Sequence, residues 1–411
     1  MNHSLYPPYA LHQHKQHGAA LLIFVLVMLL AGTSFLFSVL NSNSVKIERD
    51  KKTAAALAEA KAALIGVAIS TSSVDSAGFL TNPDTGVLPE GSAAPNMSLK
   101  DLSLVGKFPW RTLGASPLKD GSGECVWYVV SGRYKKSPKT SVFNWDTQGQ
   151  IDVIDVSGNV IATNLAALII SPDSALDAQN QALADSAYVQ CRGNYDARNY
   201  LDTYDATNAI AGAVNYFTGS TNNRLAPDTN NKQFVLARND HYNDKFLFVT
   251  VEEIFRPIIR RADFLVQIQN FLGDNGFRLQ VEPGHLETVA VSSAGTKGAD
   301  NIDCNKLSSA NKTFCKNWKE MLLLTEFSPP STITIDGVST VTACTRVLIF
   351  GGQKIGVQTR LTAIDKNDPA NYLEGANLIA FAAPIANANN FVGVSTFNAS
   401  NPSADVLKCL P

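Results

Sequence analysis

Gly18-Ala-Ala-Leu-Leu-Ile-Phe-Val-Leu-Val-Met-Leu-Leu30 opens the most apolar stretch of this 411-residue chain. The run continues through Phe35-Leu-Phe37 and Val39-Leu40, and no Lys, Arg, Asp or Glu occurs between residues 16 and 45. About 20 apolar residues in a helix suffice to cross a bilayer. A cleaved secretory signal has a shorter apolar core, and an uncharged buried helix of this length is uncommon in a globular protein. The sequence therefore predicts a membrane anchor.

The next segment, residues 46–65, contains no Gly or Pro and is rich in strong helix formers. We therefore expect the membrane helix to continue into the aqueous phase as one rod. Its apolar side chains fall at three- and four-residue spacing and form one narrow stripe of small residues. The members of this stripe are Leu57, Ala60, Leu64 and Ala68.

The N-terminal region resembles the type IV prepilins and type II secretion pseudopilins. The resemblance is carried by Lys15-Gln-His-Gly18 followed by Ala19-Ala-Leu-Leu-Ile-Phe-Val-Leu26, and by the helical stretch from Ala55 to Gly66. It implies that a prepilin peptidase cuts after Gly18 and that Ala19 becomes the methylated first residue. It also implies that the long helix packs beside its neighbours in a filament core, where small side chains allow close approach.

Two positions depart from the family pattern. The fifth mature position is Ile23, where most members carry Glu, and Ala19 replaces the usual aromatic first residue. The absence of that Glu is similar to the K-type pseudopilin and to minor pilins at a filament tip. The resemblance therefore implies a minor or tip subunit.

Three segments follow from this interpretation: a leader at 1–18, a transmembrane and filament-core helix at 19–72, and an extracytoplasmic globular domain at 73–411. The positive-inside rule, applied to the basic cluster at 46–52, would leave the large domain in the cytoplasm. Six cysteines, all after the apolar run, favour an oxidising periplasm instead. We expect a single-pass inner-membrane protein with a periplasmic domain, placed in a filament or at the cell surface after assembly.

The predicted fold class is α+β: a long transmembrane helix extending into a stalk, then a large β-rich domain with inserted helices. A strand is expected at 125–130, and hairpins at 150–163 and 331–342, the latter because Asp336-Gly337 suits a two-residue turn. The second arm of the 331–342 hairpin is expected to extend through 346–350. Thr250 and Glu253 form a candidate capping box for a helix facing inward with Ile254, Ile258, Phe264, Leu265, Ile268 and Phe271. Shorter helices are expected at 175–188 and 204–217.

The cysteines are disulfide candidates, although sequence alone does not choose among their 15 pairings. Free buried thiols are the alternative. We expect a local loop closed by Cys304 and Cys315, and a tail held by Cys409. The full set is Cys125, Cys191, Cys304, Cys315, Cys344 and Cys409.

Catalytic and metal-binding patterns are weak in this sequence. No nucleophile elbow or zinc-binding helix motif is present, and only His241 and His285 lie beyond residue 17. Both are better explained as residues of solvated turns. The acidic loops 120–124 and 365–374 offer oxygen ligands for calcium without EF-hand spacing. Trp110, Trp127 and Trp145 are expected to pack in the core rather than to stack on a ligand.

The expected function is therefore assembly rather than catalysis: a minor pilin or pseudopilin without a cofactor. The expected partners are other pilin or pseudopilin subunits, the prepilin peptidase, the inner-membrane assembly platform and membrane lipid. A net charge of -2 argues against nucleic acid. The alternative is a membrane-anchored periplasmic hydrolase or a surface adhesin with an uncleaved anchor.

Overall fold

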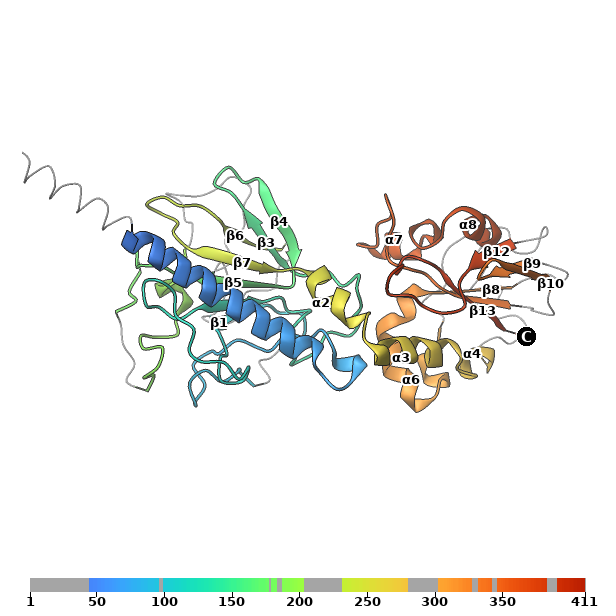
Figure 1. The fold of residues 1–411 in the computed structure, drawn as a ribbon, viewed down its shortest axis with the longest axis horizontal. Helices are drawn as coiled ribbons and strands as arrows, with labels where there is room; N and C mark the ends of the chain where they lie inside the picture. The colour runs from blue at the N-terminus through green and yellow to red at the C-terminus, as the bar shows by residue number, and fades with distance from the viewer. Residues whose placement is uncertain are drawn as a thin grey trace, which may run out of the picture. The chain divides into compact units, whose positions relative to one another are not determined.

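The computed structural model describes most of the chain after the apolar run. The described residues are 44–95, 99–176, 179–182, 187–202, 231–279, 302–326, 332–341, 346–382 and 390–410. The chain divides into two compact units, one up to Lys52 and one from Thr53 onward. The boundary lies inside a helix of residues 44–69, here named the N-terminal helix. All contacts below belong to the second unit, which is α+β with a β-rich body (Figure 1).

The central element of this unit is an antiparallel sheet in the order β1-β2-β5-β7. Its side chains alternate between two buried faces, as the pleat of a strand requires. Tyr128 and Val130 of β2 face one hydrophobic core, and Trp127 and Val129 face another. Because both faces of β2 are buried, its sequence is apolar almost without interruption. The strands are β1 (Leu104–Lys107), β2 (Trp127–Val130), β5 (Ala167–Ser171) and β7 (Lys245–Val249).

Each face of the central sheet is covered by a different layer. The N-terminal helix and α2 (Val251–Ile258) contribute to the core on one face. A second sheet contributes to the core on the other face, together with Tyr200 and Leu201. In this second sheet, β3 pairs with β4 in the antiparallel and with β6 in the parallel sense. Its strands are β3 (Ile151–Ile154), β4 (Val160–Leu165) and β6 (Lys232–Val235).

The C-terminal half holds two further three-stranded sheets. In one, β11 (Arg346–Phe350) pairs antiparallel with both β8 (Leu322–Glu326) and β13 (Val406–Leu410). In the other, β9 pairs antiparallel with β10 and parallel with β12. The strands of this sheet are β9 (Thr332–Ile335), β10 (Val338–Val341) and β12 (Asn390–Gly393).

Short helices surround these two sheets, and an aromatic cluster packs α3 and α6 against β11. Trp318 lies 5.3 Å from Phe264 and 6.2 Å from Phe350 between ring centroids. The α-helices are α3 (Ala262–Leu272), α4 (Gly276–Leu279), α6 (Ser309–Trp318), α7 (Ala363–Asn367) and α8 (Gly375–Ala382). The 3-10 helices are η1 (Val74–Ser76), η2 (Ala197–Asn199), η4 (Cys304–Lys306), η5 (Lys319–Met321) and η6 (Pro369–Asn371).

The predicted transmembrane helix is corrected by the structure. Among the described residues, no helix has the length and apolarity that crossing a bilayer requires. The fold with a transmembrane helix leading into a stalk, and the single-pass inner-membrane localisation that rested on it, are therefore wrong for the described chain. Residues 19–40 lie outside the described residues. The helix that is described, 44–69, is charged over 46–52 and packs its later turns on the body instead of standing free as a stalk.

Several local predictions are confirmed. β9 and β10 form the expected hairpin, with positive φ at Asp336 and Gly337. β3 and β4 form the second hairpin. Thr250 caps α2 through a reciprocal capping box with Glu253. The three predicted core tryptophans are buried, with 9% of Trp110, none of Trp127 and 6% of Trp145 exposed.

Three other predictions differ from the structure. The helix expected to include residues 254–271 is divided in two: α2 ends at Ile258 and α3 begins at Ala262, because the backbone is extended at Arg261. β11 belongs to the sheet with β8 and β13 rather than to the β9–β10 hairpin. The described positions within 175–188 are not helical, and the helix predicted at 204–217 lies outside the described residues.

Candidate functional site

The candidate site is the N-terminal helix, because it contains the stretch from Ala55 to Gly66, one of the two stretches on which the predicted resemblance to pilins rests. One side of it is buried in the body: Ala56, Leu57, Ala60, Leu64 and Ala68 are all less than 9% exposed. These residues include the whole stripe predicted from sequence. The stripe therefore packs on the protein's own core rather than on a neighbouring molecule. Small side chains at these positions let the helix approach the body closely.

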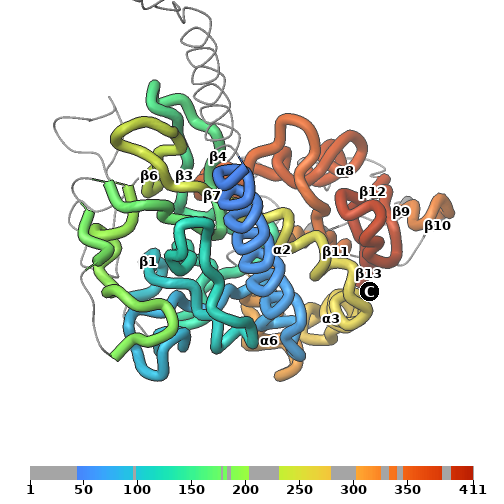
Figure 2. Tube along the Cα trace, turned by 60° about the vertical axis from the view of Figure 1, so that its left-hand side comes forward, coloured from blue at the N-terminus to red at the C-terminus, as the bar shows by residue number. Residues whose placement is uncertain are grey.

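Three polar contacts fix the helix to the body. Near its first turns, the Thr53 hydroxyl accepts a hydrogen bond from the backbone N–H of Gly121 at 2.9 Å. In its middle, Lys61 donates to the Glu253 carboxylate of α2. At its end, Arg261 donates to the carbonyl oxygen of Ile69 at 2.7 Å. Figure 2 shows the helix in blue, running beside α2.

The Lys61–Glu253 contact is partly sheltered from water. Burial pushes the pKa of Glu253 up, but hydrogen bonds from Lys61 and Thr250 outweigh it and hold that pKa below its usual value. The carboxylate therefore stays ionised, serving both as the capping residue of α2 and as the partner of Lys61.

The opposite side of the helix is exposed and also small. Ala55, Ala58, Ala62 and Gly66 are all exposed and follow one another at three- and four-residue spacing, which places them on one face. A Cβ added at Gly66 would meet no atom within 4 Å. We call these four residues the outer stripe. Glu59, also exposed, lies on the same face, four residues after Ala55 and three before Ala62. With the inner side held by the body, the small residues of the outer stripe would allow a second helix to approach closely beside Glu59.

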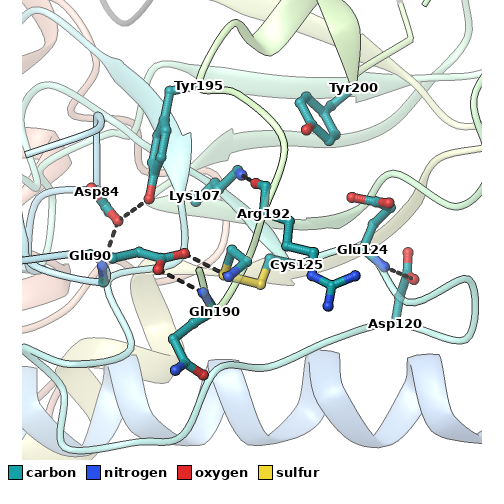
Figure 3. The surroundings of a disulfide bond; sticks show 12 residues. Asp84, Glu90, Lys107, Asp120, Glu124, Cys125, Gln190, Arg192, Tyr195 and Tyr200 are labelled. Atoms are coloured by element: carbon teal, nitrogen blue, oxygen red, sulfur yellow. Dashed lines mark hydrogen bonds between the residues drawn. A yellow bond between two sulfur atoms is a disulfide. The ribbon is translucent and has the colours of Figure 1, made fainter. Parts of the chain in front are cut away.

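A disulfide joins the loops that lie beside the helix. Cys125 pairs with Cys191, 66 residues further along the chain (Figure 3). The Glu90 carboxylate accepts hydrogen bonds from the backbone N–H groups of Gln190 and Cys191, at 2.8 and 2.6 Å. Cys125 belongs to the same hydrophobic core as the inner side of the helix. The disulfide therefore holds the 187–202 segment against the layer that carries the helix.

Next to the disulfide lies a buried network of charged and aromatic side chains (Figure 3). The Lys107 ammonium donates to the carbonyl oxygen of Arg192 at 2.8 Å and lies over the rings of Tyr195 and Tyr200. Burial lowers the pKa of Lys107 to about 8, against the attraction of nearby carboxylates. The Tyr195 hydroxyl donates to Asp84 at 2.7 Å.

Asp84 completes this network. Its carboxylate also accepts backbone hydrogen bonds from Gly86 and Gly91. Burial raises the pKa of Asp84, although these hydrogen bonds act in the opposite direction. Asp84 and Lys107 both bond to groups of the protein itself. The arrangement therefore positions loops 84–91 and 190–195 on β1.

The cysteine predictions can be compared with the structure directly. Cys304 pairs with Cys315, as expected. Cys409 is also disulfide-bonded, as expected for a residue that holds the tail. The Cys125–Cys191 pair had no local signal in the sequence. Cys344 lies outside the described residues, as do the processing residues Gly18 and Ala19.

The described residues that were considered for catalysis or calcium binding lie on turns or accept local hydrogen bonds. His241 is exposed on a turn closed by the Asn239 side chain, and His285 lies outside the described residues. Asp120 accepts four hydrogen bonds, from Ser122, Glu124, Ser171 and Asp173. These bonds occupy the oxygens that a cation would need.

The second acidic loop is likewise occupied by local bonds. Asp365 forms a capping box with Thr362 at the start of α7, and Asp368 caps η6. In the described parts of the chain, no group of three or more His, Cys, Asp or Glu side chains could hold a metal ion.

The comparisons with known proteins give no relative. No protein-family model, no curated protein and no solved structure matches the chain.

Reasoning from the sequence missed the outer stripe. Its spacing is as regular as that of the inner stripe, but alanine is compatible with either a buried or an exposed face. Only the larger Leu57 and Leu64 indicated which side would be apolar enough to be buried.

Proposed function

We propose that this chain is a filament subunit of the type IV pilin-like class, either a minor pilin or a type II secretion pseudopilin. The prepilin peptidase cuts it after Gly18, and it assembles through its N-terminal helix into a type IV pilus or a pseudopilus. Its proposed partners are other pilin or pseudopilin subunits, the peptidase and the assembly platform. Its role is structural rather than catalytic.

The observation that carries this proposal is that one side of the N-terminal helix is buried on the body while the opposite side is exposed and carries small residues. The inner side is fixed to the body by apolar packing and by contacts at Thr53, Lys61 and Ile69. Within the described structure the four residues of the outer stripe are exposed and are Ala or Gly, and the exposed Glu59 lies on the same face. Small side chains on an exposed helix face let a second helix approach closely.

Two features support a place at the filament tip. The compact unit from Thr53 to Pro411 is bulky, and a large body fits poorly in a closely repeating shaft. In addition, Ile23 stands where most family members carry the Glu that pairs with the N-terminal amine of a neighbour. A subunit with no neighbour beyond it has no use for that carboxylate.

The first experiment tests the outer stripe. Ala58→Trp and Ala62→Trp place bulky rings on the face where close helix approach is proposed. At exposed positions they should change the free energy of unfolding by no more than about 0.5 kcal/mol. Ala310→Trp, at an exposed position of α6, is the matched control.

The readout is the fraction of the protein recovered with sheared filaments from the native cell. We expect both stripe variants to lose incorporation and the control to keep it. Normal incorporation of the double variant Ala58→Trp/Ala62→Trp would contradict the proposed use of this face.

The second experiment tests processing. Mass spectrometry of the mature protein should find Ala19 at the N-terminus, with or without a methyl group, and Gly18→Leu should leave the leader attached. An intact leader on the native protein in cells with active peptidase would rule out the pilin-like proposal.

A further inference from the structure

Asp202 and Asp244 are two buried carboxyl groups, each of which binds the other's backbone. The N–H of Asp202 donates to the Asp244 carboxyl group at 2.9 Å, and the N–H of Asp244 donates to the Asp202 carboxyl group at 2.8 Å. The N–H of Asn243 donates to the same oxygen of Asp202. Only 7% of Asp202 and 3% of Asp244 are exposed. These reciprocal bonds, here named the clasp, join the end of the 187–202 segment to the residues just before β7.

The hydrogen bonds of the two carboxyl groups differ. Both oxygens of Asp202 have N–H donors, because Oδ2 accepts the two backbone bonds and Oδ1 accepts from the side chain of Gln179 at 3.3 Å. In Asp244, Oδ2 accepts from the Asp202 backbone, whereas Oδ1 is buried and has no partner within the described structure. A buried charge without donors is costly, but a protonated carboxyl group is neutral. The geometry therefore places the negative charge on Asp202 and the proton on Asp244.

The surrounding charges favour the same distribution. Asp202, Asp173 and Asp120 all act on Asp244 with negative charge, and the adjacent Lys245 pairs with Asp173 at 3.2 Å. Burial, followed by this repulsion, raises the pKa of Asp244 well above its usual value. Burial raises the pKa of Asp202 to about 6, although its hydrogen bonds act in the opposite direction. Above that pH the pair therefore keeps one proton, on Asp244.

We propose that the clasp is a pH-sensitive switch: it is closed while Asp244 carries a proton, and loss of that proton to solvent releases Asn243 and Asp244 from Asp202. Ionised Asp244 would place a second negative charge beside Asp202 in a buried site, with one oxygen that no donor reaches. Opening exposes both carboxylates to water and relieves their repulsion. The clasp thus holds the two ends of the 203–242 stretch together at low pH and releases them as the pH rises. No residue of the N-terminal helix takes part, so the proposal is independent of filament assembly.

Hydrogen exchange of the Asp202 and Asp244 backbone N–H groups in the intact protein measures opening of the clasp. Above about pH 6 the closed clasp binds one proton more than the open one, so its opening constant should rise up to about tenfold per pH unit. After correction for the intrinsic pH dependence of exchange, the protection of both groups should fall by the same factor. The N–H groups of β2, which belong to the buried central sheet, should keep their protection.

Two variants separate the switch from a general effect of charge. Asp244→Asn keeps an oxygen to accept from Asp202 and puts an NH₂ group in place of the protonated oxygen, so it mimics the closed form. Its clasp should stay protected at every pH between about 6 and 8, without the native slope. Asp240→Asn removes a carboxylate from an exposed position of the preceding turn, and should keep that slope.

A direct measurement of protonation needs no variant. The ¹³Cγ resonance of Asp244 in the native protein should have the position of a protonated carboxyl group at about pH 6.5, far above the usual pKa of Asp. This result decides the proposal even if Asp244→Asn fails to fold. An ionised Asp244 at that pH, protection of the clasp that does not change with pH, or a native slope in Asp244→Asn would each overturn the proposal. Protection that follows added calcium instead of pH would overturn it as well.

Discussion

The buried ion pair between Asp146 and Arg360 is predicted to be among the most costly contacts to break. Both side chains are almost fully buried, at 2% and 1% exposed, and the two charged atoms are 3.0 Å apart. The guanidinium also donates to the carbonyl oxygens of Asn371 and Gly352, at 2.6 and 3.0 Å. It lies over the ring of Tyr372, 4.0 Å from its centroid. The pair joins the 144–148 loop to the C-terminal half of the chain.

Asp146→Asn keeps the shape of the side chain and removes its charge, leaving Arg360 as a buried cation without a counterion. Removing one partner of a buried pair typically costs about 3–5 kcal/mol. The two carbonyl acceptors and the Tyr372 ring partly stabilise the remaining cation, so we expect the lower end, about 3 kcal/mol. That is a large part of the 5–15 kcal/mol that stabilises a typical domain. By contrast, Arg256→Gln in the exposed Arg256–Glu252 pair should cost less than about 0.5 kcal/mol.

Equilibrium unfolding in urea, with the disulfides intact, measures these differences through tryptophan fluorescence and circular dichroism. Because the expected cost comes from an unpaired charge, Asp146→Leu/Arg360→Met, which removes both charges, should be less destabilised than Asp146→Asn alone. A cost below about 1 kcal/mol for Asp146→Asn would refute the reasoning. A double variant as unstable as the sum of the two single variants would also refute it.

Two further predictions concern the disulfides and the pH dependence of stability. Replacing the Cys125–Cys191 pair by serines should lower the free energy of unfolding by about 4 kcal/mol, and replacing the Cys304–Cys315 pair by about 3 kcal/mol, because the first disulfide closes the longer loop. A larger loss for the Cys304–Cys315 variant in urea unfolding would contradict this prediction. Burial raises the pKa of Asp405 to about 6 in the folded state, above its usual value of 3.8. The native state therefore binds the extra proton between about pH 6 and 4, and stability falls as the pH rises through that window. Asp405→Asn should raise the free energy of unfolding at pH 7 by about 1–3 kcal/mol and flatten its pH dependence between about pH 4 and 6. A loss of stability at pH 7 would argue against it.

Features fixed by neighbouring residues could be predicted from the sequence. The Asp336-Gly337 turn has the positive φ values that a tight hairpin needs. The capping box at Thr250 depends on residues three positions apart. The Cys304–Cys315 loop is short enough to close locally. In each case the physical cause lies within about a dozen residues, so one sequence is enough to show it.

Features fixed by distant residues could not be predicted in this way. β5 pairs with β7 across a long insertion, and β3 pairs in parallel with β6. Nothing in either strand specifies its partner, since β-branched and aromatic side chains suit many pairings. The Cys125–Cys191 disulfide depends on that packing, so this pairing could not be predicted from the sequence either. What the inner side of the helix packs against was open for a related reason: small residues suit both the protein's own core and a neighbouring helix.

The helix contacts also determine how the protein would respond to mechanical load. In the proposed filament, a subunit would receive tension through its helix, and a pull along the helix axis would act on its attachments to the body as shear. Thr53, Lys61 and Ile69 place those attachments near the start, in the middle and at the end of the body-bound segment. The apolar inner side lies between them. The attachments therefore share the load in parallel, and the helix would have to slide as a whole before any one contact failed alone.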